Sequence, residues 1–338
     1  MGANLSAAPA WLNGKMRRLA ALNMDTGQVD NSFQPPTPNA YINTLFLSGT
    51  RLYIGGVFTS FSGTSAATRP GVAALDAATG VLDDTFNPPQ NYGGVFTGHG
   101  GSPQEDQPGA APNYGSVRSI VTTADGKTIM VAGDFLHFGT TKAADPGHKH
   151  AGLIALNTTG ALTPWQPLSS RPTFGLTVWP GDGKTIFAAT GGAGGSIEAY
   201  LPGFANTPAG SPLWAGHVDG DGLSVASTLD RVYLVGHYDH EVPRADDPCF
   251  TPTPQPPNGV LGISCPNGTP HRHLAAFETR TGHVDPTFTA QADTPEGPDV
   301  AFIGAHQMYV GGNFTQVSDT PGANYRSQLG LAIYPAIG

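Results

Sequence analysis

The chain has 338 residues, of which 12% are charged, and it carries 46 glycines, 31 prolines and a formal net charge of −9. No basic stripe runs along the sequence, which argues against nucleic acid as a partner, and no apolar run approaches the ~18 residues that a membrane-spanning helix needs. Because hydrophobic residues still reach 39%, the composition predicts a folded protein of short strands joined by turns.

Two sequence patterns recur along the chain. Residues 1–15 lack the charged-then-apolar pattern of a signal segment, and we expect them to form an N-terminal extension. Repetition at this spacing indicates a repeat architecture. The first pattern reads RLYIGGVFTSFSG from Arg51, TIMVAGDFLHFGT from Thr128, RVYLVGHYDHEVP from Arg231 and QMYVGGNFTQVSD from Gln307. The second reads MRRLAALNMDTGQVDNSFQP from Met16, RPGVAALDAATGVLDDTFNP from Arg69, HAGLIALNTTGALTPWQP from His150 and HRHLAAFETRTGHVDPTFTA from His271.

Each repeat predicts four antiparallel strands. Strand one leads into a tight turn, and strand two ends in paired glycines, which suit a crowded or bulged position. Strand three is rich in small residues and ends in an Asx-x-x-Thr-Gly turn, where the glycine can supply positive φ. Strand four carries a large aromatic residue. We call these repeats modules one to six, and they lie at about 16–36, 41–89, 115–167, 174–216, 219–290 and 297–335.

Four strands in ~45–50 residues are typical of a β-propeller blade. The sequence therefore predicts an all-β fold, a β-propeller of four-stranded antiparallel blades that forms a single domain over residues 16–338. Module one offers strands three and four only, and module six lacks strand four. The N-terminal strand QVDNSFQP could complete module six and close the ring. The number of blades, five or six, stays open.

The pattern GGxFT followed by LAALDxxTGxxDxxF resembles the delta-60 repeat, a family of β-propellers in secreted bacterial proteins. The resemblance covers residues 16–335, nearly the whole chain. Module four departs from it at Thr190-Gly191-Gly192, and module five has Tyr238 where phenylalanine is usual. The resemblance implies secretion or cell-surface display beside other modules. It implies no catalytic residues.

Long insertions and histidines predict a binding face. The insertions 90–114, 139–149, 242–270 and 317–325 all belong to loops on one face of a propeller, and nine of the eleven histidines fall on or beside it. Loops that carry function need a rigid scaffold beneath them. We therefore expect this long-loop face to bind the ligand. The candidate residues are His99, His148, His150, His271, His273 and Tyr92.

Module five gathers the strongest cluster of polar residues. Its strand two ends in YLVGHYDHEV, from Tyr233 to Val242, and its strand one starts at Asp219-Gly220-Asp221. Antiparallel pairing brings these ends together. One interpretation is a metal site for a structural divalent cation, calcium or zinc. The other is that the aspartates bond backbone N–H groups in a turn and the histidine is an ordinary strand residue. The candidate ligands are Asp219, Asp221, His237, Asp239 and His240.

The two cysteines, Cys249 and Cys265, bracket a loop rich in proline, threonine and glycine. A disulfide between them would close this loop, and such bonds persist outside the reducing cytosol. Two unrelated free thiols are the alternative.

These features together predict a secreted or cell-surface propeller that recognises a glycan or a protein ligand on its long-loop face. Adjoining modules or other copies of the chain are further partners to consider. One alternative is an extracellular hydrolase or lyase with a His/Asp site, with or without metal, at the channel mouth of module five, 219–290. Another is a structural assembly module.

Overall fold

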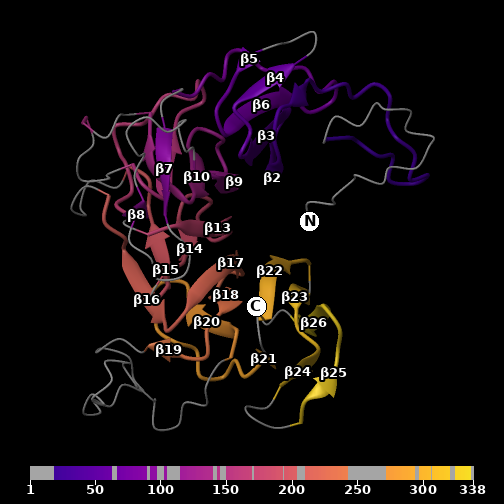
Figure 1. Ribbon diagram of the computed structural model, residues 1–338. Coiled ribbons are helices and arrows are strands. Elements are labelled where there is room, and N and C mark those ends of the chain that lie inside the picture. The colour runs from indigo at the N-terminus through magenta and orange to yellow at the C-terminus, as the bar shows by residue number, and fades with distance from the viewer. Residues whose placement is uncertain are drawn as a thin grey trace. The chain divides into compact units, whose positions relative to one another are not determined.

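The computed structural model describes most of the chain as β-strands and turns. It describes 19–62, 67–89, 92–96, 103–104, 115–139, 143–144, 150–169, 171–192, 194–203, 210–242, 272–293, 297–305, 307–319 and 324–335. These residues form no helix, so the all-β prediction is confirmed for them (Figure 1). None of them forms a helix of the length and apolar character needed to cross a membrane.

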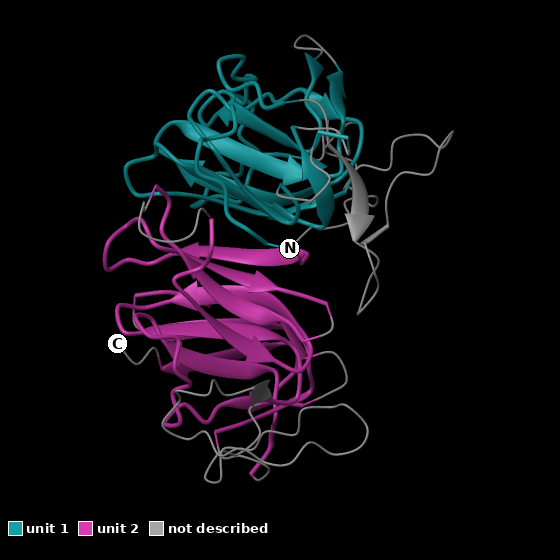
Figure 2. Ribbon diagram, turned by 90° about the vertical axis from the view of Figure 1, so that its left-hand side faces the viewer, with its two compact units in different colours: residues 1–96, 103–170 teal, residues 97–102, 171–338 magenta. Residues whose placement is uncertain are grey.

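The structure divides into two compact units, residues 1–96 with 103–170 and residues 97–102 with 171–338 (Figure 2). The division falls between the predicted modules three and four, so it cuts through no module. In both units, strands one, two and three of each complete module pair antiparallel in chain order, as the repeat predicts.

The strands of the main sheets, apart from β12, are labelled in Figure 1. In the first unit, module two has β2 (Ile42–Ser48), β3 (Arg51–Gly56) and β6 (Val72–Asp76), and module three has β9 (Val117–Thr122), β10 (Ile129–Gly133) and β12 (Leu153–Leu156). In the second unit, module four has β13 (Thr173–Val178), β14 (Ile186–Thr190), β15 (Ser196–Tyr200) and β16 (Trp214–Val218), module five has β17 (Asp221–Ser227), β18 (Arg231–His237) and β20 (Leu274–Glu278), and module six has β22 (Gly297–Ile303), β23 (Gln307–Asn313) and β26 (Leu331–Pro335).

Strand four is shorter than the sequence predicts. Among the described residues, only module four has a full fourth strand; modules one, two, three and five show a single bridge in its place. In module two, the side chain of Asp83 accepts hydrogen bonds from the backbone and hydroxyl of Thr85, and the Phe86 N–H bonds back to the Asp83 carbonyl. This local turn ends the strand. The bridges are Leu22↔Val29, Leu75↔Leu82, Leu156↔Leu162 and Phe277↔Val284.

Crowding explains the paired glycines of strand two. A Cβ on Gly56 would lie 2.1 Å from the carbonyl oxygen of Tyr41, and one on Gly55 would lie 2.5 Å from a methyl group of Val117 in module three. The register between β2 and β3 shifts at this point. The prediction of a crowded, bulged position is therefore confirmed.

In modules two and five, the buried side of strand four carries its aromatic residue. Phe86 packs edge-on against Tyr53 of strand two at 5.2 Å between ring centroids, and Phe288 packs against Tyr233 in the same way at 5.3 Å. All four rings are buried. The same aromatic contact therefore ties strand four to strand two in module two of the first unit and in module five of the second unit.

Smaller sheets, which we call corner sheets, lie at the end of strand two. A short strand before strand one pairs with a short strand that follows strand two. Pro38 pairs with Phe61, Val218 with Glu241, and Ala292 with Val317. The corner sheets comprise β1 (Thr37–Pro38), β4 (Ser60–Ser62) and β5 (Ala67–Thr68); β7 (Tyr92–Phe96), β8 (Pro103–Gln104) and β11 (Phe135–Phe138); β19 (Glu241–Val242) on β16; and β21 (Gln291–Ala292), β24 (Gln316–Ser318) and β25 (Arg326–Ser327).

Candidate functional site at the corner of module five

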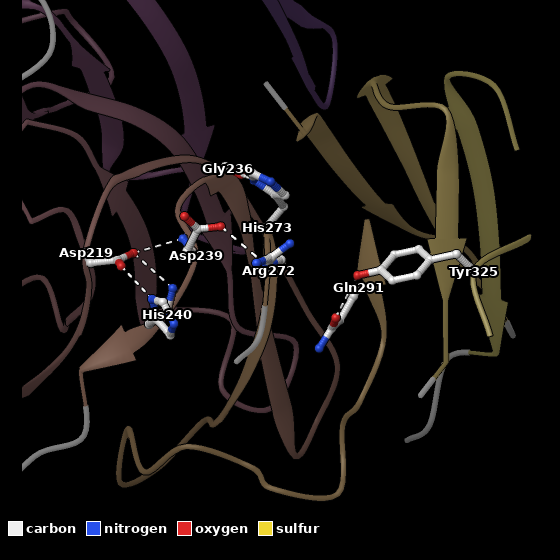
Figure 3. Close-up of polar contacts among 8 residues, drawn as sticks. All are labelled: Asp219, Gly236, Asp239, His240, Arg272, His273, Gln291 and Tyr325. Atoms are coloured by element: carbon white, nitrogen blue, oxygen red, sulfur yellow. Dashed lines mark hydrogen bonds and ion pairs between the residues drawn. The ribbon is translucent and has the colours of Figure 1, made fainter. Parts of the chain in front are cut away.

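Asp219 caps the loop that follows strand two of module five (Figure 3). Its Oδ1 accepts the backbone N–H groups of Asp239 and His240, both at 2.9 Å. Its Oδ2 lies 2.9 Å from Nδ1 of His240, and its own N–H donates to the His240 carbonyl at 3.0 Å. Both carboxylate oxygens of Asp219 therefore take part in local hydrogen bonds.

The same cap occurs in two other modules. In module two, Asn39 Oδ1 accepts the N–H groups of Thr59 and Ser60. In module six, Asp293 Oδ1 accepts the N–H groups of Thr315 and Gln316. The amide of Asn39 and the carboxylates of Asp219 and Asp293 thus accept the same pair of backbone N–H groups, which fixes the chain at the end of strand two.

The electrostatics of Asp293 agree with this role. Burial alone would raise the pKa of its carboxyl group, but the hydrogen bonds from Thr315 and Gln316 outweigh it and hold the pKa below its ordinary value. The cap therefore favours the ionised carboxylate.

The other residues of the predicted metal cluster separate into distinct contacts. Asp221 is buried and accepts the Gly192 N–H at 2.5 Å, and it pairs across the strands with the exposed His237. Asp239 lies 3.6 Å from the Arg272 guanidinium, and both side chains are about half exposed. Among the described residues, no three His, Cys, Asp or Glu side chains come together in a way that could hold a metal ion. The geometry gives the predicted calcium or zinc site no support, and it favours the interpretation of the aspartates as turn residues.

His273 is the most unusual residue of this corner. It has a φ of +67°, a region that costs a non-glycine residue ~1–3 kcal/mol. The corresponding residues of modules two, three and six are Gly71, Gly152 and Gly330, with φ between +65° and +70°. In all four, the carbonyl accepts the N–H of a strand-two glycine. Module five therefore keeps a strained histidine where the repeat uses glycine.

The His273 ring is held tightly. Its Nδ1 lies 2.9 Å from the Gly236 carbonyl, so Nδ1 carries the proton and donates it. The ring stacks on His237 at 6.2 Å between centroids. Its Nε2 is buried and has no hydrogen-bond partner within the described part of the chain. Strain of this kind, when the surroundings maintain it, is typical of functional positions.

Burial lowers the pKa of His273, while its bond to Gly236 and the nearby Asp239 carboxylate act in the opposite direction. His237 and Arg272 add to the lowering. The net effect favours the neutral imidazole.

Other predicted site residues lie elsewhere or outside the described residues. His150 is a half-buried turn residue before β12, in the first unit. Tyr92 starts β7, opposite Phe138, and only its backbone is described. His99, His148, His271, Cys249 and Cys265 lie outside the described residues, so the disulfide stays a prediction.

Sequence reasoning offered the bonding of Asp219 to backbone N–H groups as one interpretation, but it missed the repetition of this cap, the strain at His273 and a repeated ion pair. Arg51 bonds Asp83 and Thr85, and Arg231 bonds Asp285 and Thr287 in the same geometry. The aligned repeats contain a signal for each of these features. The cap corresponds to an Asp or Asn shortly before strand one, and the strained residue to a histidine where other repeats have glycine. The ion pair corresponds to an arginine on strand two and an Asp-x-Thr sequence on strand four.

The chain matches no protein-family model, and a search of curated proteins finds no significantly similar sequence.

The cap and a metal site predict different effects of substitution at Asp219. Asp219→Asn keeps the oxygen that caps the corner, as Asn39 does, so we expect a loss of less than ~0.5 kcal/mol in the free energy of unfolding. Asp219→Ala removes it and should cost ~0.5–2 kcal/mol. Urea unfolding with and without EDTA measures both. Equal damage from both variants, together with chelator-sensitive wild-type stability, would contradict the cap.

The lowered pKa of His273 predicts a stability that depends on pH. Because the unfolded state binds the proton more readily, this contribution is complete above the unfolded pKa near 6.5 and is lost as pH falls toward the folded pKa. His273→Gly, which restores the repeat's own residue, should reduce the pH slope of stability between about pH 7 and pH 5. The exposed His217→Gln serves as the control. An unchanged slope in His273→Gly would show that another group causes it.

Proposed function

We propose that this chain is a secreted or cell-surface β-propeller whose corners form a binding surface for a glycan or a protein ligand. Five modules with main sheets of the predicted order, and a half-module at residues 19–36, support a propeller of five or six blades. Val29 lies on the N-terminal strand that the sequence offers to complete module six, and it pairs with Leu22 of its own half-module. The resemblance to the delta-60 repeat and the two cysteines support an extracellular location.

The observation that carries the proposal is the repeated, capped corner. The segments after β4, β11, β19 and β24 all begin at the end of a corner strand and lead to strand three of the same module, through β5 in module two and β25 in module six. Their lengths differ greatly, while the caps of Asn39, Asp219 and Asp293 are the same. A constant anchor beneath variable loops is the arrangement of a binding scaffold.

The corner of module five offers the chemistry that polar ligands need. The side chains of Arg272, Asp239 and His240 are 49%, 52% and 56% exposed, and they provide a planar donor, an acceptor and an imidazole. Nearby in the same unit, Tyr325 donates to the buried Gln291 at 3.1 Å (Figure 3). Sugar hydroxyls pair with such donors and acceptors, and aromatic faces stack on sugar rings.

A matched pair of arginines tests this site. Arg272 precedes β20 at the corner, whereas Arg280 follows β20 at its other end and lies over the Trp179 ring. For any ligand found on a glycan array or by protein capture, Arg272→Ala should weaken binding about tenfold, the loss of one charge-assisted hydrogen bond. Arg280→Ala should leave binding within about twofold. Equal effects of the two variants would place the ligand elsewhere. The absence of any ligand, with self-association in solution, would favour the structural-assembly alternative.

One contact favours the hydrolase or lyase alternative. The Asp219 carboxylate bonds Nδ1 of the half-exposed His240, which leaves Nε2 as a potential general base. Under this alternative, His240→Gln should abolish turnover of nitrophenyl esters or glycosides, while His217→Gln should not. Wild-type protein without measurable turnover would contradict it.

A further inference from the structure

The backbone at His273 is suited to glycine, and no imidazole is needed to form it. In module five, the Gly236 N–H donates to the His273 carbonyl at 3.1 Å, and the His273 N–H donates to the Tyr238 carbonyl at 2.9 Å. The glycines at this position of modules two, three and six make the same two bonds. They do so without the strain that a positive φ causes in histidine. The imidazole must therefore be explained by what its side chain adds.

The side chain adds a third bond and a contact with module six. Its Nδ1 donates to the Gly236 carbonyl at 2.9 Å, so the residue before strand three also holds the end of strand two. Its ring lies on the backbone of Gly297, where a Cβ would come within 2.6 Å of the ring. Beside it, the Arg272 carbonyl accepts the Ala292 N–H from β21 at 3.3 Å. The seated ring therefore joins modules five and six at the corner.

The seated ring cannot accommodate a second proton. Only 1% of His273 is exposed, and its Nε2 is buried without a hydrogen-bond partner among the described residues. In the neutral imidazole this nitrogen is an acceptor, whereas protonation would put a charged N–H group there with no acceptor to receive it. A buried charge without a partner costs far more than an unpaired acceptor. Protonation therefore favours a state in which the ring has left its place.

The charged groups around the ring do not offset this cost. Burial has the largest influence on the pKa of the His273 ring and lowers it, while the backbone carbonyl that the ring binds and the Asp239 carboxylate raise it. His237, at the end of strand two, and the adjacent Arg272 lower it further. Three further carboxylates of these corners accept backbone N–H groups: Asp219, Asp221 and Asp293. The neutral ring is therefore the form that fits the closed corner.

We propose that the His273 ring is a pH-sensitive latch between modules five and six, closed while the imidazole is neutral and opened by its protonation. Opening breaks the bond to Gly236 and the contact with Gly297. A side chain that titrates between about pH 5 and pH 8 is what glycine at this position cannot provide. Because Arg272 and Asp239 flank the ring, opening also changes how these two exposed side chains are presented. The latch lies within the second unit and does not depend on the ligand proposed above.

Hydrogen exchange at single amides of the full chain tests the latch, because the repeat supplies matched controls. The Gly236 N–H reports on the latch, and the equivalent N–H groups of Gly56, Gly133 and Gly312 donate to glycines, which have no side chain to protonate. The pKa of the seated ring lies below the ordinary value near 6.5. We therefore expect the protection factor of Gly236, corrected for intrinsic exchange, to fall about tenfold from pH 7.5 to pH 5.5. The controls should stay within about twofold.

Two variants separate the imidazole from other causes. His273→Gly restores the residue that other modules use, so it should fold and should remove the pH response of Gly236. His273→Asn tolerates positive φ and keeps a side-chain N–H donor but does not titrate. It should therefore retain the protection of Gly236 at pH 7.5 and also lose the pH response.

Three results would overturn the latch. One is a constant protection factor of Gly236 in the wild-type chain, and another is an equal fall at the control glycines, which would indicate a global effect of pH. The third is a pH response of Gly236 that persists in both variants of His273. In that case, loss of the response in His237→Gln would identify the stacked imidazole as the sensor instead.

Discussion

The close approach of one module's first strand to the second strand of its neighbour is the constraint on which the rest of the structure depends. Gly55 leaves room for Val117 and Ile120, and no side chain larger than hydrogen fits there without displacing them. Sheets that stack this closely bury both faces, so main-sheet strands of four to seven residues suffice to build a core. The Tyr53–Phe86 and Tyr233–Phe288 contacts then fix the outer strand against the inner ones.

The same closeness divides the molecule into constant and variable parts. Backbone groups that crowd at the end of strand two must be satisfied, and the Asx caps do so with hydrogen bonds to two successive N–H groups. After this corner, the chain continues into insertions whose lengths differ from module to module. The proposed binding role at the corners is compatible with this division, because loop variation there leaves the cap and the core unchanged.

Module five departs from the repeat at its corner, the place proposed above for ligand binding. His273 occupies a position that three other modules give to glycine, and its ring stacks on His237 beside the Asp239–Arg272 pair. A protein maintains a strained, buried imidazole when the surrounding contacts compensate for it. At the cluster that the sequence suggested as a metal site, Asp219 caps a corner and Asp221 is a buried turn aspartate, and the strained His273 stacks on His237 beside them.

The sequence by itself determined the repeat, the strand order within each module and the crowded glycines, because these depend on local patterns of alternation and turn residues. It also placed Asp219, Asp239 and His240 close together, since antiparallel pairing of adjacent strands requires it. Only the tertiary structure decided what those side chains bond, because a carboxylate looks the same in a metal site and in a cap until its partners are known. It likewise decided that strand four shrinks to a single bridge in modules one, two, three and five, because local turns such as that of Asp83 and Thr85 end the strand early.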